Sequence, residues 1–320
     1  MKVILYVFSG TGNTLKVAGL YKKFLQEHTA SNADAEASES DASASVDIYR
    51  ISAKSGEIPN PDEYDLVGIG YPIHGFSAPE PTIRLCKALP KTDKKRTFIF
   101  KTSGEGLHIN DCSSQKCIKI LKKKGYDVVS ERHIVMPYNM IYRHTDEMAK
   151  QMWIYAHALV DLSCRDLLAD KREKVDLPFF KQFYCPPIRF LEQKFAHLHG
   201  PAFKVNSKKC IKCNRCVNVC PTDNIQIKNG KYKFGHNCVL CMGCSFGCPM
   251  DAINVGVFGL WKVHGSYEVE KLKDDENIPF PYVPEHAKGI YRLYKKYYKE
   301  CDEMLAKAGI NVYDYIQNKT

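Results

Sequence analysis

The sequence of 320 residues contains no apolar run long enough to cross a lipid bilayer. A spanning helix needs about 20 such residues. The first apolar run, 3–8, has six residues and leads into a glycine-rich loop without a cleavage-like segment. We therefore expect a protein that is neither exported nor inserted in a membrane.

Two common nucleotide-binding motifs are also missing. There is no G-x-x-x-x-G-K-[ST] run, which argues against a nucleoside triphosphate site, and no G-x-G-x-x-G run for a dinucleotide. Tryptophan is scarce, with two residues, Trp153 and Trp261. An apolar content of 44% and a charged content of 26% are ordinary for a folded chain, and the length suggests about two domains.

Cysteine, in contrast, is abundant, with 14 residues, of which eight lie within 210–248. There the pattern C-x2-C-x2-C-x3-C-P occurs twice, 28 residues apart. Its first copy is Cys210, Cys213, Cys216 and Cys220, and its second copy is Cys238, Cys241, Cys244 and Cys248. The segments 220–225 and 248–253 are also alike outside the cysteines, which indicates an internal duplication.

This cysteine pattern predicts iron–sulfur clusters. Two-residue spacers place three thiolates around one face of a cubane, and in the bacterial ferredoxin run the fourth cysteine binds the other cluster. We assign one [4Fe-4S] cluster to Cys210, Cys213, Cys216 and Cys248, and the other to Cys238, Cys241, Cys244 and Cys220. Zinc explains neither the third cysteine nor the proline. Residues 205–256 resemble clostridial two-cluster ferredoxins, which implies low-potential one-electron transfer.

The net charge of +10 comes mainly from the cysteine-rich segment, because residues 204–256 hold eight basic and two acidic residues. Thiolates that bind iron would offset part of this surplus, so we expect no nucleic-acid partner. The remaining positive charge would help to steer an acidic protein partner toward this segment.

The first half of the chain alternates apolar strand-like runs with helical patterns, which is typical of an α/β protein with a parallel sheet. Strands are expected at 3–8, 46–51, 66–70, 97–101 and 133–135, and helices at 14–28, 79–88, 113–124 and 146–168. The run 30–45 consists of small and acidic residues, and we expect a flexible insert there.

A phosphate site is expected where the first strand ends. The loop consists of Ser9, Gly10, Thr11, Gly12, Asn13 and Thr14, and a helical pattern follows it directly. Backbone N–H groups at a helix N-terminus attract anions, and the polar side chains of this loop add further donors.

The loop SGTGNT after a leading strand resembles the FMN-phosphate loop of flavodoxins, and the likeness in strand rhythm continues to about Leu168. The resemblance implies a doubly wound five-stranded parallel sheet in the order 2-1-3-4-5, with FMN at the carboxyl ends of the strands. It implies that two loops bracket the flavin ring. They are Tyr71, Pro72, Ile73, His74, Gly75 and Phe76, and Thr102, Ser103, Gly104, Glu105 and Gly106. Since neither tryptophan lies in these loops, Tyr71, His74 and Phe76 are the candidates for stacking on the ring.

The chain as a whole resembles the flavodoxin–ferredoxin fusion proteins of anaerobic bacteria over about residues 1–256. We expect a flavodoxin-like domain at 1–168, a connecting arm at 169–203, a small α+β ferredoxin domain at 204–256 and a C-terminal extension at 257–320. An amphipathic helix at 284–310 is expected to dock on the rest of the protein through a tyrosine-rich stripe.

The resemblance implies an intracellular electron-transfer protein that relays single electrons between two [4Fe-4S] clusters and FMN, and so couples one- and two-electron carriers. Such a protein needs redox partners, and thiolate-bound clusters suit the cytoplasm of an oxygen-poor cell. The main alternative is an FMN-dependent reductase of a small molecule, which requires an open pocket and a proton donor, with His74 or Tyr138 as candidates. A regulatory iron–sulfur sensor is a third class, but no nucleic-acid module accompanies the clusters.

Overall fold

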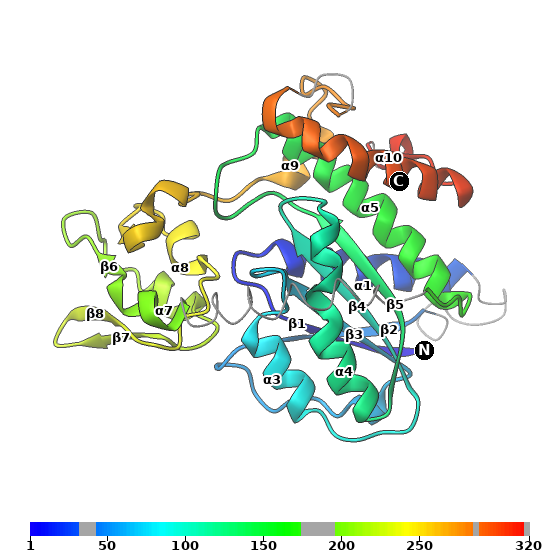
Figure 1. The fold of residues 1–320 in the computed structure, drawn as a ribbon, viewed down its shortest axis with the longest axis horizontal. Coiled ribbons are helices and arrows are strands. Elements are labelled where there is room, and N and C mark those ends of the chain that lie inside the picture. The colour runs from blue at the N-terminus through cyan, green and yellow to red at the C-terminus, as the bar shows by residue number, and fades with distance from the viewer. Residues whose placement is uncertain (32–42, 174–195, 284–287, 317–320) are drawn as a thin grey trace.

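The computed structural model describes residues 1–31, 43–173, 196–283 and 288–316 (Figure 1). Most of the expected insert at 30–45 and of the expected connecting arm at 169–203 lies outside these ranges. The main element is a five-stranded parallel sheet in the order β2-β1-β3-β4-β5. Its strands are β1 (Lys2–Val7), β2 (Ser45–Arg50), β3 (Leu66–Pro72), β4 (Lys95–Ser103) and β5 (Tyr126–Val135). This is the flavodoxin-like order, so the predicted fold is confirmed.

Helices cover both faces of this sheet. Helices α1 (Asn13–Ser31) and α5 (Asp146–Leu168) share one hydrophobic cluster with Val3, Leu5 and Val7 of β1. Helices α3 (Glu80–Ala88) and α4 (Gln115–Lys123) share another with Ile4 and Tyr6. Because alternate side chains of β1 point to opposite faces and both faces are buried, the strand reads as a continuous apolar run.

Strand β5 is longer than its sequence predicts, because it begins at Tyr126 and not near residue 133. Its middle section contains Glu131 and Arg132, which interrupt the apolar pattern. Glu131 forms an ion pair with the buried Lys101 of β4, and Arg132 pairs with Glu173. Partners from distant parts of the chain thus satisfy these polar side chains within the strand.

The cysteine-rich segment forms a small α+β unit beside the sheet (Figure 1). It contains the helices α7 (Arg215–Val219) and α8 (Gly243–Phe246) and the antiparallel hairpin of β7 (Ile225–Lys228) and β8 (Lys231–Phe234). Its outer strands, β6 (Lys204–Val205) and β9 (Ile253–Asn254), form a second antiparallel pair. This agrees with the expected small α+β ferredoxin unit.

The C-terminal extension packs on α5. Helix α9 (Val269–Asp274) lies against α5, and helix α10 (Tyr294–Lys307) buries Tyr298, Cys301 and Leu305 against it. The tyrosine-rich stripe therefore docks on the protein as predicted, although α10 begins at Tyr294 and follows a 3-10 turn, Gly289–Leu293. Residues 284–287 lie outside the described ranges. None of the described helices is long and apolar enough to cross a membrane.

Candidate functional site

A cavity of about 660 Å³ opens at the carboxyl edge of the parallel sheet. The loops after β1, β3, β4 and β5 form its walls, together with Leu240 and Phe258 from the cysteine-rich segment and the turn that follows it. Ligands of open α/β sheets bind at this edge, where the strand order reverses.

Most of the residues expected to bind FMN meet in this cavity. They are Ser9, Gly10, Thr11, Asn13, Thr14, Pro72, Ile73, His74, Gly75, Phe76, Thr102, Ser103, Gly104 and Glu105. The other three, Gly12, Tyr71 and Gly106, do not line it. Tyr71 is fully buried in the core on the α3 and α4 side of the sheet, so its ring is no candidate for stacking on a flavin. At Gly106 a Cβ would lie 2.3 Å from the ring of Tyr297, so this glycine faces α10.

The loop before α1 has the features of a phosphate site. Two of its hydroxyl side chains, Ser9 and Thr14, are buried. The hydroxyl of Thr14 lies 2.8 Å from that of Thr102. The first turn of α1 contains no acidic residue, so no carboxylate within that turn neutralises the positive end of the helix. A dianionic phosphate group fits this loop.

The loop after β3 places an aromatic ring in the cavity. His74 and Ser77 exchange two backbone hydrogen bonds of 2.9 Å across a tight turn. The two central residues, Gly75 and Phe76, have positive φ values of 47° and 59°, as a type I′ turn requires. A non-glycine residue in this conformation costs about 1 kcal/mol or more, and such strain is concentrated at functional sites. Phe76 is therefore the stronger candidate for contact with a flavin ring.

His74 lines the same wall and lies half-buried between the cavity and the cysteine-rich loop at Val239. Burial lowers the pKa of His74 to about 4, so the imidazole is neutral near pH 7.

The opposite wall is formed by Gly104, Glu105 and Tyr138. The ring of Tyr138 packs directly on the main chain of Gly104, where a Cβ would lie 2.0 Å from the ring. The hydroxyl of Tyr138 bonds to the carboxylate of Glu105, which also accepts a 2.8 Å hydrogen bond from Nδ2 of Asn110. Burial, reinforced by the charge of Glu105, raises the pKa of Tyr138, which keeps the phenol protonated.

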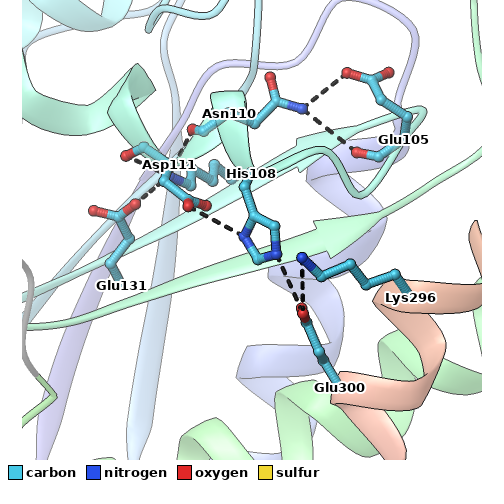
Figure 2. A network of polar contacts seen from close by, with 8 residues as sticks. Glu105, His108, Asn110, Asp111, Glu131, Lys296 and Glu300 are labelled. Atoms are coloured by element: carbon cyan, nitrogen blue, oxygen red, sulfur yellow. Dashed lines mark hydrogen bonds and ion pairs between the residues drawn. The ribbon is translucent and has the colours of Figure 1, made fainter. Parts of the chain in front are cut away.

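A polar network supports this wall from behind (Figure 2). The backbone carbonyl of Asn110 accepts a hydrogen bond of 3.0 Å from Nζ of Lys101, and Lys101 pairs with Glu131. Figure 2 also shows His108 between Asp111 and Glu300. His108 does not line the cavity. The network thus connects the loop after β4 to β5 and to helix α10.

Tyr294, the first residue of helix α10, is also hydrogen-bonded to this wall. Nδ1 of His144 accepts a 3.1 Å hydrogen bond from the N–H of Tyr138, so the neutral ring carries its proton on Nε2. This Nε2 lies 2.9 Å from the hydroxyl of Tyr294, which in turn donates to the carbonyl of Gly104. One directed chain of hydrogen bonds therefore connects Tyr138, His144, Tyr294 and Gly104.

The eight cysteines of the repeat form two groups. Cys210, Cys213, Cys216 and Cys248 line one small cavity together. Burial raises the pKa of Cys241, and the neighbouring thiols of Cys238 and Cys220 raise it further. Burial also raises the pKa of Cys244, as do the thiols of Cys241, Cys238, Cys220 and, with the smallest effect, Cys216. Cys238, Cys241, Cys244 and Cys220 therefore lie near one another as a second group, which adjoins Cys216 of the first. Each group thus contains one cysteine from the other copy of the motif, as in the crossed assignment.

The backbone around the two groups repeats with the sequence. Positive φ values recur at three pairs of positions 28 residues apart: Lys212 and Leu240, Asn214 and Met242, and Asp223 and Asp251. Backbone N–H groups donate to Sγ of Cys210, Cys238, Cys220 and Cys248 over 3.2 to 3.4 Å. Such donors stabilise a thiolate, which is the form that binds iron.

Within the described ranges, no three Cys, His, Asp or Glu side chains converge closely enough to share one metal ion. A four-iron cubane has room for this arrangement, because each thiolate binds a different iron atom. The donor set therefore fits a [4Fe-4S] cluster in each group.

One cysteine group lies directly against the phosphate loop. A Cβ at Gly243 would lie 2.4 Å from the carbonyl oxygen of Gly10, so the two main chains are in contact. Nδ2 of Asn139 donates to Oγ1 of Thr11 at 3.2 Å and to the carbonyl of Cys241 at 3.3 Å. We refer to Cys238, Cys241, Cys244 and Cys220 as the proximal group, and to Cys210, Cys213, Cys216 and Cys248 as the outer group.

The sequence missed most of the loop after β5 and several residues at the edge of the cavity. The missed residues are Leu107, Asn110, Met136, Pro137, Asn139, Met140, Ile141, Leu240 and Phe258, whereas Tyr138 was already named as a candidate proton donor. The carboxyl-end rule for parallel strands, applied to the fifth strand, would have found residues 136–141. No sequence pattern points to Leu240 or Phe258.

Comparison with known proteins gives matches to both halves of the chain. Residues 209–253 match the family described as 4Fe-4S dicluster domain. An uncharacterized ferredoxin of Methanocaldococcus jannaschii is 36% identical over 81 residues, which cover 23% of this chain and 87% of that protein. The pyruvate synthase subunit PorD of the same organism is 37% identical over 51 residues, which cover 15% of this chain and 59% of the subunit.

Two solved flavodoxin structures are similar to the chain. Flavodoxin 1 from Bacillus cereus has 16% identity and a TM-score of 0.33, with 49% of this chain and 95% of that chain covered. The Streptococcus pneumonia TIGR4 flavodoxin has 14% identity and a TM-score of 0.37, with 53% and 99% covered.

Proposed function

This chain belongs to the 4Fe-4S dicluster ferredoxins and carries a flavodoxin-like domain in front of its ferredoxin domain, and we propose that it relays single electrons between two [4Fe-4S] clusters and FMN. Its family and fold indicate an electron-transfer role. When bound, the clusters supply one-electron steps, and FMN, which takes one or two electrons, couples them to two-electron carriers.

The residues that would hold each group follow from the geometry. The loop Ser9–Thr14 and the N-terminus of α1 would bind the phosphate of FMN. Phe76 on one wall and Tyr138 on the other would bracket the ring. The proximal and outer groups of cysteines would each hold one cluster.

The contact between Gly10 and the loop of the proximal group is the observation that carries the proposal. Two sites that exchange electrons must lie close together, and here the main chains of the two binding loops touch. Asn139 bonds to both loops and keeps them in register. Because both sites lie in one chain, electron transfer between them does not require the diffusional encounter that two separate carrier proteins need.

The positions of the two cysteine groups also suggest the order in which electrons would pass between the flavin and an external protein. The proximal group lies beside the phosphate loop, whereas the outer group includes Cys213, whose side chain is exposed. We propose that the proximal group serves the flavin and that the outer group serves an external protein.

A second candidate function is reduction of a small molecule at the flavin. It is favoured by Tyr138, a protonated phenol that lines the cavity and bonds to Glu105. This pair has the chemistry of a proton donor to a reduced product. This candidate would be contradicted if only protein acceptors oxidised the reduced flavin and if the oxidation rate were the same in the wild type and in Tyr138→Phe.

Anaerobic purification with iron and flavin quantified tests the proposal. We expect about eight irons and one FMN per chain, as two four-iron clusters and one flavin require. Electron paramagnetic resonance of single-cysteine variants tests the crossed ligand sets. Cys220→Ala should lose the same signal as Cys238→Ala, and Cys248→Ala should lose the same signal as Cys210→Ala. Pairing of Cys220 with Cys210 would contradict the assignment, and absence of flavin at any loading would contradict the relay.

A further inference from the structure

The surface around the outer cysteine group carries unpaired positive charge. Both acidic residues of the segment are already engaged: Asp223 lies 3.5 Å from Nζ of Lys54, and Asp251 pairs with Lys262. Lys208, Lys209 and Lys212 are exposed, and none of them forms an ion pair with another described residue. The charge of these three lysines is therefore directed to the solvent.

The same surface has an apolar centre. Ile211 is 59% exposed and Met250 is 45% exposed, and both line the small cavity of the outer group. The same cavity is lined by Cys213, the exposed cysteine of that group. We refer to Lys208, Lys209, Ile211, Lys212, Cys213 and Met250 as the Cys213 face.

The composition of the Cys213 face suits a protein partner. Protein interfaces combine an apolar centre with a polar rim. A single-stranded nucleic acid instead follows an extended positive groove with stacked aromatic rings. Here the three lysines come from a single short segment, 208–212, which covers a compact area.

We propose that the Cys213 face is the docking site of an acidic electron-transfer protein. This inference rests on the proposed relay, because the outer group must exchange electrons with something outside the chain. The proximal group is covered by the flavodoxin-like domain, so an external protein approaches the outer group. Opposite charge on the partner would raise the association rate about tenfold or more at low ionic strength.

The test uses a separate, strongly acidic two-cluster ferredoxin as the probe. The triple variant Lys208→Gln, Lys209→Gln and Lys212→Gln is compared with the full-length wild type. Binding is measured by calorimetry with both proteins oxidised, and electron transfer by stopped flow. At low salt we expect the triple variant to bind at least about tenfold more weakly and to react at least about tenfold more slowly, with most of the salt dependence lost.

A matched control removes the same charge elsewhere. Lys87, Lys91 and Lys119 are exposed on the flavodoxin-like domain, around α3 and α4. Their triple exchange to Gln should change binding and rate less than about twofold. Equal effects of the two triple variants would overturn the docking site, because the loss of binding would then depend on the net charge of the protein and not on the position of the lysines.

Two further measurements separate this inference from the relay itself. Photoreduced deazaflavin, a small reductant, should reduce the clusters and flavin of the wild type and of the triple variant alike. If the bound flavin of the wild type stays oxidised while the clusters are reduced, the relay fails, whatever the ferredoxin binding shows. If the wild type binds a single-stranded oligonucleotide or anionic vesicles more tightly than the ferredoxin, and the triple variant loses that binding, the docking proposal is overturned.

Discussion

Gly10 lies so close to Cys241 that a Cβ at Gly10 would be 2.6 Å from the Cβ of Cys241 and 2.8 Å from its carbonyl oxygen. Both of these atoms belong to parts of the chain that cannot rotate away. The contact joins the loop proposed to bind the FMN phosphate to the loop of the proximal cysteine group. The absence of a side chain at Gly10 is what permits the two main chains to approach.

We expect Gly10→Ala to separate these two loops. The added methyl group has no free space, so the cluster loop must shift by several tenths of an ångström or more. Iron content should remain near that of the wild type, since the cysteine side chains are unchanged. Hydrogen exchange should rise in residues 239–244, and electron transfer between clusters and flavin should slow by about tenfold or more.

Gly19→Ala is the matched control for this substitution. Gly19 lies in helix α1, which follows the same loop, and apart from its chain neighbours and the backbone of its own helix no atom lies within 4 Å of its Cβ position. Alanine favours the helix by about 0.5–1 kcal/mol, so this variant should be slightly more stable with unchanged kinetics. If Gly10→Ala behaves like Gly19→Ala, the two loops are not in contact in solution.

The local patterns of the sequence were sufficient for most of the elements of the sheet, and the flavodoxin resemblance of the loop SGTGNT supplied the sheet order and much of the cavity. The run Val3–Phe8 followed by SGTGNT indicates a buried strand, a turn and a helix, and each of these signals lies within about ten residues. The cysteine spacing is equally local. Where residues close in the sequence determine the local structure, the sequence pattern is sufficient to predict that structure.

The remaining features depend on contacts between distant residues. The start of β5 was missed because Glu131 and Arg132 look like surface residues until Lys101 and Glu173 are placed beside them. Tyr71 was expected at the flavin because it begins the loop after the expected strand 66–70, which the flavodoxin resemblance places beside the ring, but its side chain points to the core. The C-terminal tyrosines carry no motif, yet Tyr294 bonds to the cavity wall.

Phe76→Asn should stabilise the flavin-free protein and weaken flavin binding. Asparagine tolerates the left-handed conformation that Phe76 adopts at φ 59°, so up to about 1 kcal/mol of strain is relieved. The variant also loses the aromatic surface in the cavity, and stacking is worth about 0.5–1.5 kcal/mol. Denaturant unfolding of the flavin-free protein and fluorescence titration with FMN measure the two effects. Lower stability together with unchanged FMN affinity would contradict the role given to Phe76.

The buried histidines should make the protein sensitive to acid. Burial lowers the pKa of His144 to about 3 and of His74 to about 4, whereas histidine in an unfolded chain titrates near 6.5. Between these values the unfolded state binds more protons, so the free energy of unfolding falls as the pH decreases from about 6.5 toward 4. Protonation of His144 would also remove the acceptor for the N–H of Tyr138 and loosen the cavity wall.

His144→Gln tests this titration directly. Glutamine stays neutral, so the slope of unfolding free energy against pH between about 6 and 4 should decrease by about 1.4 kcal/mol per pH unit. At about pH 8 both proteins are neutral at this position, and the variant should be less stable by about 1–2 kcal/mol through poorer hydrogen bonds. Parallel slopes for wild type and variant would show that His144 is not the group that titrates.

Lys101→Met should destabilise the protein more than any surface exchange of lysine. Lys101 is 1% exposed, and its Nζ forms an ion pair with Glu131 and donates a hydrogen bond to the carbonyl of Asn110. Removing one partner of a buried ion pair typically costs about 3–5 kcal/mol, because the remaining charge is left uncompensated. Because Asn110 bonds to Glu105, flavin affinity should fall as well.

The double variant Lys101→Met with Glu131→Gln distinguishes an unpaired charge from lost packing. The glutamine side chain would be neutral and could still accept a hydrogen bond from Ser114, which bonds to Glu131 in the wild type. If the uncompensated carboxylate is the main cost, urea unfolding should show the double variant to be more stable than Lys101→Met by about 1–3 kcal/mol. Flavin affinity should stay low in both, because neither restores the bond from Lys101 to Asn110. Recovery of flavin binding in the double variant would mean that Glu131, and not the Lys101 contact with Asn110, controls the cavity wall.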